Sequence, residues 1–168
     1  MTKQSIKLYD STLRDGAQTK GVNFSLDDKL KILDILNDIG VDFIEGGWPG
    51  ANPTDDIFFK KISKKLRSKV VAFGMMRKPG KSASNDPGLN SVLNSGVSSA
   101  CLVGKTWDFH VKNALNISFS ENLDMISDSI KHASERLDEV MFDAEHFFDG
   151  FKHNKKYSLD SIERAFKS

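Results

Sequence analysis

Residues 25–50 read SLDDKLKILDILNDIGVDFIEGGWPG, and this stretch decides the class of fold. Ser25, followed three residues later by Asp28, is a pattern that begins helices, and apolar residues then recur at helical spacing. Gly40 is typical of the residue that ends a helix. The mostly apolar residues 41–44 follow directly and predict a strand. The stretch therefore predicts a helix that is followed at once by a strand.

The same alternation repeats along the whole chain. Strands are predicted at residues 6–9, 41–44, 69–73, 98–103 and 139–142, and helices at 26–39, 55–66, around 89–93, at 121–137 and at 158–166. Strand–helix units of about 30 residues indicate a parallel sheet with right-handed crossovers. Two α/β architectures accept this pattern, an open doubly wound sheet and part of a β/α barrel.

The composition is that of an ordinary globular protein. Of the 168 residues, 39% are hydrophobic and 28% are charged, which excludes wholesale disorder. The formal net charge of +1 argues against a nucleic-acid partner. The single cysteine, Cys101, excludes an intramolecular disulfide, and no apolar run is long enough for a membrane span. Because the first residues lack the apolar core of a secretory signal, we expect a cytoplasmic protein with no membrane partner.

Ionisable residues collect directly after the predicted strands. Arg14 and Asp15 follow the first strand, Glu45 the second and Lys105 the fourth, and Asp143 and Glu145 follow the fifth. Barrel enzymes keep their chemistry at the carboxyl ends of the strands. An open sheet would favour a glycine-rich phosphate loop there, and the sequence has none. The barrel is therefore the preferred architecture.

Each candidate residue has a chemical and a structural interpretation. Asp15 carries oxygen ligands of the kind that hard divalent cations prefer, although Asp-Gly is also a common turn pair. Arg14 can hold a carboxylate or a developing negative charge, or form a structural salt bridge with Glu45. Glu145 and His146 suit acid–base chemistry, or a hydrogen-bonded pair at a strand end.

Two further residues are interpreted as structural. His110 has no partner at metal-ligand spacing and is predicted to be a surface or core histidine. Cys101 lies in a predicted buried strand and is interpreted as a small apolar residue rather than a nucleophile.

Four motifs, in order along the chain, resemble a known enzyme superfamily. They read YDSTLRDGAQ at residues 9–18, EGGWPGANP at 45–53, GKTWDFH at 104–110 and FDAEHFFDG at 142–150. The first resembles the first-strand motif shared by isopropylmalate synthase, homocitrate synthase and hydroxymethylglutaryl-CoA lyase. The other three resemble the citramalate synthase branch of that superfamily. The similarity runs from about residue 6 to residue 168, and four ordered motifs are far more specific than one.

The resemblance implies an acyltransferase that condenses acetyl-CoA with pyruvate and water to give (R)-citramalate and CoA. It implies a divalent metal, Mg²⁺ or Mn²⁺ in preference to Zn²⁺, with acetyl-CoA as co-substrate. It also implies a place in isoleucine biosynthesis and a homodimeric complete enzyme. The alternatives are an isopropylmalate synthase-like enzyme that uses a larger 2-keto acid, and a lyase of the same superfamily.

The resemblance also assigns roles to individual residues. The implied catalytic residues are Arg14, Glu45 and Glu145, the implied substrate-binding residues are Arg14, Gln18 and Lys105, and the implied metal ligand is Asp15. Arg14 would hold the keto acid and the developing oxyanion, Glu45 would position Arg14, and Glu145 would handle protons.

The predicted strands fill only part of a barrel. A complete β/α barrel has eight strands in roughly 250 residues, and only five are predicted here. The superfamily's later metal ligands, a His-x-His pair and an asparagine, have no counterpart in this sequence. We therefore expect residues 1–168 to form the N-terminal portion, about the first five βα units, of a pyruvate-carboxyltransferase-type TIM-barrel catalytic domain. We expect this portion alone to be inactive, or to be a non-catalytic piece that pairs with a partner supplying the missing strands.

Overall fold

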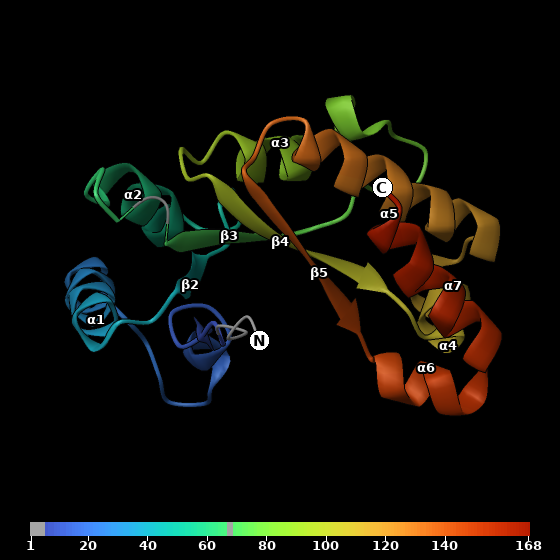
Figure 1. Cartoon of the computed structure of the whole chain (residues 1–168), viewed down its shortest axis with the longest axis horizontal. Coiled ribbons are helices and arrows are strands. Elements are labelled where there is room, and N and C mark those ends of the chain that lie inside the picture. The colour runs from blue at the N-terminus through green and yellow to red at the C-terminus, as the bar shows by residue number, and fades with distance from the viewer. Residues whose placement is uncertain (1–5, 67–68) are drawn as a thin grey trace, which may run out of the picture.

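The computed structural model describes residues 6–66 and 69–168, in which five parallel strands form one curved sheet in the order β1-β2-β3-β4-β5 (Figure 1). The strands are β1 (Tyr9–Asp10), β2 (Phe43–Gly47), β3 (Val70–Met75), β4 (Ser99–Lys105) and β5 (Glu139–Glu145). The predicted first half of a β/α barrel is confirmed in this arrangement, because sequence order and spatial order coincide.

Helices follow every strand and lie along the convex side of the sheet (Figure 1). The α-helices are α1 (Leu26–Ile39), α2 (Pro53–Lys61), α3 (Pro87–Leu93), α4 (Asp108–His110), α5 (Phe119–Ser134), α6 (Phe147–His153) and α7 (Lys155–Phe166). Short 3₁₀ turns occur at η1 (Gly16–Gln18) and η2 (Ala83–Asn85), and a π-helical turn at η3 (Val111–Leu115). None of the helices in the described ranges is long and apolar enough to cross a membrane.

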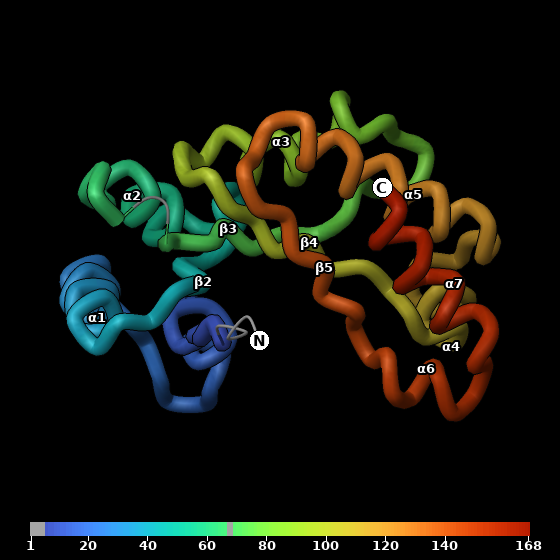
Figure 2. Tube along the Cα trace, in the orientation of Figure 1, coloured from blue at the N-terminus to red at the C-terminus, as the bar shows by residue number. Residues whose placement is uncertain are grey.

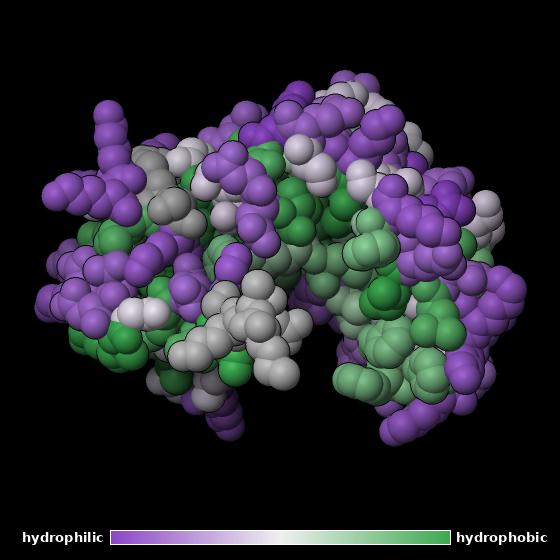
Figure 3. Space-filling view, in the orientation of Figure 1, coloured by the Kyte–Doolittle hydropathy of each residue, from purple (hydrophilic) through white to green (hydrophobic). Residues whose placement is uncertain are grey.

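The core lies between the sheet and its outer helices. Alternate strand residues such as Ala100 and Leu102 pack there against helix residues such as Phe58 and Ile126, and all of these side chains are buried. The intervening residues point to the concave side, as the two-residue period of a strand requires. That concave side is hollowed between the part of the chain around β1 and the part around α6 (Figure 3).

The helix that decided the fold class forms as predicted. The Ser25 side chain accepts from the backbone N–H of Asp28 while the Asp28 carboxylate accepts from the Ser25 N–H, a complete capping box. Gly40 ends α1 in the left-handed conformation with φ of 91°. The following strand, β2, begins two residues later than predicted and continues through Glu45 to Gly47.

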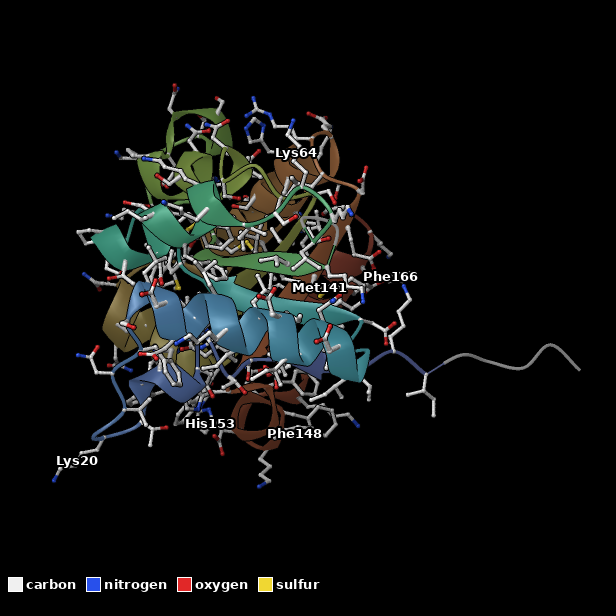
Figure 4. The ribbon with its side chains drawn as sticks, turned by 90° about the vertical axis from the view of Figure 1, so that its left-hand side faces the viewer. Lys20, Lys64, Met141, Phe148, His153 and Phe166 are labelled. Atoms are coloured by element: carbon white, nitrogen blue, oxygen red, sulfur yellow. The ribbon has the colours of Figure 1, made fainter. Side chains whose placement is uncertain are left out.

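The first strand is shorter than the predicted 6–9. It ends at Asp10 because the Ser11 carbonyl accepts from the N–H groups of Arg14, Asp15 and Gly16, which turns the chain immediately. The chain then passes through η1 to α1, with Lys20 at the outer tip of this connection (Figure 4).

The region after β5 differs most from prediction. A helix, α6, occupies residues that were not predicted to be helical, and α7 begins before the predicted residue 158. Gly150 disfavours a helix by intrinsic propensity, but it is buried so closely that an added Cβ would lie 2.6 Å from the Thr106 carbonyl. The start of α7 is fixed by Asn154, whose side chain accepts from the Tyr157 N–H at 3.2 Å.

Candidate active site

The predicted site residues lie at the carboxyl ends of the strands. Along β4 and β5 the Cα partners include Val103 with Asp143 and Lys105 with Glu145. Because their neighbours Leu102 and Phe142 pack into the core on the convex side, these residues point to the concave side. β1 and β5 are the two outer strands of the sheet, and Figure 2 shows the dark blue part of the chain near β1 and the orange α6 after β5 on opposite sides of the view.

Arg14 is held in place on three sides. Its Nε donates to Oε2 of Glu45 at 2.7 Å, and its Nη1 donates to Oδ1 of Asp15 at 3.1 Å. The guanidinium carbon lies 3.9 Å from the centroid of the Phe73 ring, which is within the range of a cation–π contact. A guanidinium whose plane is fixed in this way is pre-organised to bind an anion at its remaining N–H groups.

Glu45 is a buried carboxylate, only 1% exposed, and both of its oxygens are used. Oε1 accepts from the Tyr9 hydroxyl at 2.9 Å while Oε2 accepts from Arg14. Burial raises the pKa of Glu45 in opposition to the Arg14 charge and the two hydrogen bonds. Its geometry fits a residue that orients Arg14 rather than one that touches a ligand.

Cys101 lies beside this pair and is buried. Burial, with the nearby Glu45 charge, raises the pKa of the Cys101 thiol to about 12. The thiol is therefore protonated at neutral pH, in agreement with its interpretation as an apolar residue rather than a nucleophile.

Asp15 and Gln18 lie on the solvent side of Arg14. The Asp15 side chain is 63% exposed and contacts Arg14. Arg14 and Gln18 both line a cavity of about 400 Å³ between the β1–α1 connection and the start of α2. Its other walls include Lys29 and Trp48, so the cavity has a cationic and an aromatic side.

Lys105 and Glu145 form a second ion pair at the end of β4 and β5. The Lys105 carbonyl accepts from Asn122 Nδ2 at 2.8 Å, and Thr106 Oγ1 donates to the Glu145 carbonyl at 2.8 Å. These hydrogen bonds hold both backbones, so the ion pair is a fixed feature of the mouth of the half-barrel.

Next to this pair, Trp107, His110 and His146 form a cluster of rings. The His110 and His146 ring centroids are 4.7 Å apart with nearly perpendicular planes, and Trp107 lies 4.8 Å from His110. His110, the last residue of α4, thus has His146, the residue before α6, as a ring neighbour, which the sequence spacing of the two residues does not indicate. Burial, together with the charge of His146, lowers the pKa of His110. His146 has a φ of 55°, which is uncommon for a residue other than glycine.

Comparison with known proteins places this geometry in a family. The family model described as HMGL-like matches residues 5–156. The chain belongs to the HMGL-like family. It is 46% identical over 166 residues to the (R)-citramalate synthase of Aquifex aeolicus, and 45% identical over 167 residues to that of Sulfolobus acidocaldarius. Each match covers 98% of this chain, but the chain spans only 31% and 32% of those relatives.

Solved structures confirm the fold of this HMGL-like chain. The HMG-CoA lyase from Bacillus subtilis superimposes with a TM-score of 0.64 and 18% sequence identity. The match covers 95% of this chain and 55% of the lyase. The half-barrel is thus the first part of a fold that is longer in its structural relatives.

The HMGL-like half-barrel brings the predicted site residues into two groups. Arg14, Asp15 and Glu45 are joined by hydrogen bonds at the β1–β2 end, and Lys105 pairs with Glu145 at the β4–β5 end. Gln18 is connected to the first group only in that it lines the same cavity as Arg14. The roles that the resemblance gives these residues stay predictions.

The residues of this HMGL-like chain do not by themselves fit a divalent metal. Within residues 6–66 and 69–168, no three histidine, cysteine, aspartate or glutamate side chains converge on a point where a cation could bind. Asp15 offers one exposed carboxylate, and Arg14 already occupies one of its oxygens. Hard divalent cations need about six oxygen ligands, so Asp15 alone is an incomplete site.

One ionisable residue after the fifth predicted strand, Asp143, was given no role from the sequence. Asp143 points to the concave side between the two groups of this HMGL-like site. Burial raises its pKa, and the charges of Glu145 and Asp15 act in the same direction while Arg14 and Lys105 oppose them. The sequence places Asp143 directly after a strand, but its burial depends on residues that are distant in the chain.

Proposed function

We propose that this chain forms the first part of the catalytic barrel of an (R)-citramalate synthase, which condenses acetyl-CoA with pyruvate and water to give (R)-citramalate and CoA. The observation that carries the proposal is 46% identity across nearly the whole chain to a relative of that name, together with an Arg14 guanidinium fixed at the mouth. The reaction belongs to acyl transfer with carbon–carbon bond formation, and we place the complete enzyme in isoleucine biosynthesis, as a cytoplasmic homodimer.

Arg14 is proposed to bind the 2-oxo acid. The carboxylate of pyruvate is a planar anion that a guanidinium can bind through two N–H groups. When the enolate of acetyl-CoA attacks the ketone carbon, negative charge develops on the ketone oxygen, and a fixed cation stabilises that charge most when it needs no reorganisation. The hydrogen bond to Glu45 and the Phe73 ring supply that fixed orientation.

The second group of site residues, Lys105 and Glu145, is proposed to bind acetyl-CoA. Lys105 and Glu145 pair at the ends of β4 and β5, whereas Arg14 follows β1, the edge strand at the other side of the sheet. A lysine can bind an acidic or carbonyl group of the thioester substrate, and Glu145 keeps its ammonium group in place. Asp15 is proposed as one metal ligand, and Gln18 as a polar contact at the entrance. A bound Mg²⁺ or Mn²⁺ would polarise the ketone of pyruvate.

The test uses a chimera in which this chain is followed by the part of the Aquifex aeolicus relative that lies beyond the matched region. CoA thiol release is measured with acetyl-CoA, Mg²⁺ or Mn²⁺, and either pyruvate or a branched 2-oxo acid. We expect pyruvate-dependent release by the chimera and none by the chain alone. Activity with only the branched acid would keep the reaction class and contradict the substrate, and an inactive, folded chimera would contradict the proposed function.

A further inference from the structure

Tyr9 contacts the buried acid that holds Arg14. Its Cα pairs with that of Phe43 in the parallel register of β1 and β2, and Glu45 lies two residues beyond Phe43 on the same face. The Tyr9 hydroxyl reaches Oε1 of Glu45, to which it donates a hydrogen bond at 2.9 Å. The other oxygen, Oε2, accepts from Arg14 Nε at 2.7 Å. One carboxylate therefore joins the hydroxyl of the first strand to the guanidinium at the mouth.

A sharp turn separates Tyr9 from Arg14 along the chain. The Ser11 carbonyl accepts from the Arg14 N–H at 3.1 Å and from the next two backbone N–H groups, so the chain turns directly after β1. Tyr9 and Arg14 can therefore contact the same carboxylate, although they lie on the two sides of this turn.

The two hydrogen bonds fix the Glu45 carboxylate from different directions. The last torsion of a glutamate side chain is soft, so a carboxylate that is held through one oxygen can still rotate. A second donor from another strand removes that freedom. Because Glu45 is only 1% exposed, water cannot readily replace the Tyr9 hydroxyl, and loss of a donor to a buried acid is unfavourable.

The Tyr9 hydroxyl is a dependable donor. Burial raises the pKa of Tyr9, and the nearby Cys101 and Glu45 act in the same direction. The hydroxyl therefore keeps its proton at physiological pH and continues to donate it to Glu45.

We propose that Tyr9 is a positioning residue, which acts through Glu45 to fix the guanidinium of Arg14 in the orientation that receives the 2-oxo acid. This role rests on the proposed function. Glu45 holds one edge of the guanidinium, the Phe73 ring covers one face at 3.9 Å, and Tyr9 sets the direction of the Glu45 carboxylate. A fixed cation stabilises developing charge best because it needs no reorganisation. Loss of the Tyr9 hydroxyl should therefore affect the 2-oxo acid and not the binding of the thioester.

The first experiment observes the Arg14 side chain directly and needs no activity. The exchange of the Arg14 Nε proton with water is measured by NMR in the chain labelled with ¹⁵N at arginine. Tyr9→Phe keeps the ring and removes only the hydroxyl. We expect the Arg14 proton to exchange about tenfold faster in this variant, because the hydrogen bond to Glu45 opens more often.

Two controls are available in the same chain. Arg77 Nε donates to Asp128 on α5 at 2.8 Å, and its proton should exchange at the same rate in Tyr9→Phe and in the unmodified chain. Tyr157→Phe removes the hydroxyl of the one other tyrosine and should leave the Arg14 exchange unchanged. An unchanged Arg14 rate in Tyr9→Phe would contradict the inference, and so would faster exchange at both arginines, which indicates general loosening of the fold.

The second experiment uses the chimera. Tyr9→Phe should lower kcat/KM for pyruvate by about 10- to 100-fold, while the KM for acetyl-CoA stays within about twofold. In a double-mutant cycle with Glu45→Gln the two losses should not multiply, because both act on Arg14 through one chain of hydrogen bonds.

Losses that multiply, or equal changes in KM for both substrates, would overturn the role of Tyr9. An inactive unmodified chimera contradicts the proposed function, whereas an unchanged Arg14 exchange rate in Tyr9→Phe contradicts only the inference.

Discussion

Arg14 and Glu45 lie 31 residues apart in the chain and are joined by a 2.7 Å hydrogen bond from Nε to Oε2. The carboxylate is 1% exposed, whereas the Arg14 side chain is 17% exposed and reaches the mouth of the half-barrel. The buried acid thus fixes one edge of the guanidinium, and the N–H groups that neither Glu45 nor Asp15 engages can meet a ligand. Glu45 can hold Arg14 in this way only because β1 and β2 are neighbouring strands of the parallel sheet.

Replacing Glu45 by glutamine should destabilise the chain by about 1–3 kcal/mol, because a buried charged hydrogen bond to Arg14 is weakened. The free energy of unfolding is measured in urea. Asp15→Asn is the matched control, since Asp15 contacts the same guanidinium but is 63% exposed, and it should change stability by less than about 0.5 kcal/mol. Equal effects of the two substitutions would contradict a buried anchoring role for Glu45.

Close packing explains why glycine stands at residue 47, the second glycine after Glu45. Gly47 has a φ of 144°, and an added Cβ would lie 2.6 Å from the Asp55 carboxyl carbon. Asp55 is buried, pairs with Lys29 and accepts from the Trp48 N–H at 2.9 Å. A side chain at residue 47 would therefore displace the acid that holds both the β2–α2 loop and α1.

Gly47→Ala should accordingly lower the free energy of unfolding by at least about 2 kcal/mol, from backbone strain and from crowding of Asp55. Gly80→Ala is the control for a left-handed glycine without crowding, because Gly80 has a φ of 73° and nothing lies within 4 Å of its added Cβ. The control should cost about 1 kcal/mol, the backbone cost of alanine in the left-handed region. If both variants unfold at the same urea concentration, neither the unusual φ of Gly47 nor crowding against Asp55 adds to that cost.

Much of the fold could be predicted from local sequence. The capping box at Ser25 and the end of α1 at Gly40 depend on residues within a few positions of each other, and both are found as predicted. The helix α6 could not be predicted in this way. Its Gly150 lies against the Thr106 carbonyl, which is distant in the chain, and intrinsic helix propensity does not include that contact.

The candidate site shows the same limit. The residues after each strand could be named because parallel strands place their carboxyl ends on one edge. The burial and the hydrogen-bond partners of each residue could not be predicted, because they depend on residues from other parts of the chain. His110, at the end of α4, and His146, just before α6, come together only in the folded chain, and Lys105 reaches Glu145 from the neighbouring strand.

Asp86 provides a test of pH dependence. Its buried carboxylate accepts from the N–H groups of Leu89 and Lys78, both at 2.9 Å, and caps α3. Burial alone would raise the pKa of Asp86, but these backbone hydrogen bonds outweigh it and lower the pKa below its ordinary value. Its contribution to stability is therefore complete above about pH 3.9 and is lost as the pH falls through the lowered value.

Asp86→Asn should lower the free energy of unfolding by about 1 kcal/mol at pH 7, and the difference should shrink below pH 4 as the aspartate of the unmodified chain is protonated. Asp34→Asn, an exposed change on α1, is the control and should have little effect at either pH. A difference that stays constant down to pH 2 would contradict the lowered pKa.

The unpaired edge of strand β5 should make the chain associate with itself. Its residues are exposed or half-buried, although the paired residues of β4 are buried, because nothing covers its second edge among the described residues. Unpaired parallel edges and partly exposed apolar side chains such as Met141 (Figure 4) promote association. The sedimentation coefficient of the chain should therefore increase with protein concentration.

A charge on this strand should suppress the association, because a lysine side chain disfavours pairing with a second edge. Met141→Lys is expected to sediment as a monomer over the concentration range in which the unmodified chain associates. Ile39→Lys is the matched control: Ile39 is 69% exposed at the end of α1, and its replacement should leave association unchanged. A monomeric unmodified chain with one cooperative thermal transition would show that β5 is stable as an open edge, which would contradict the prediction.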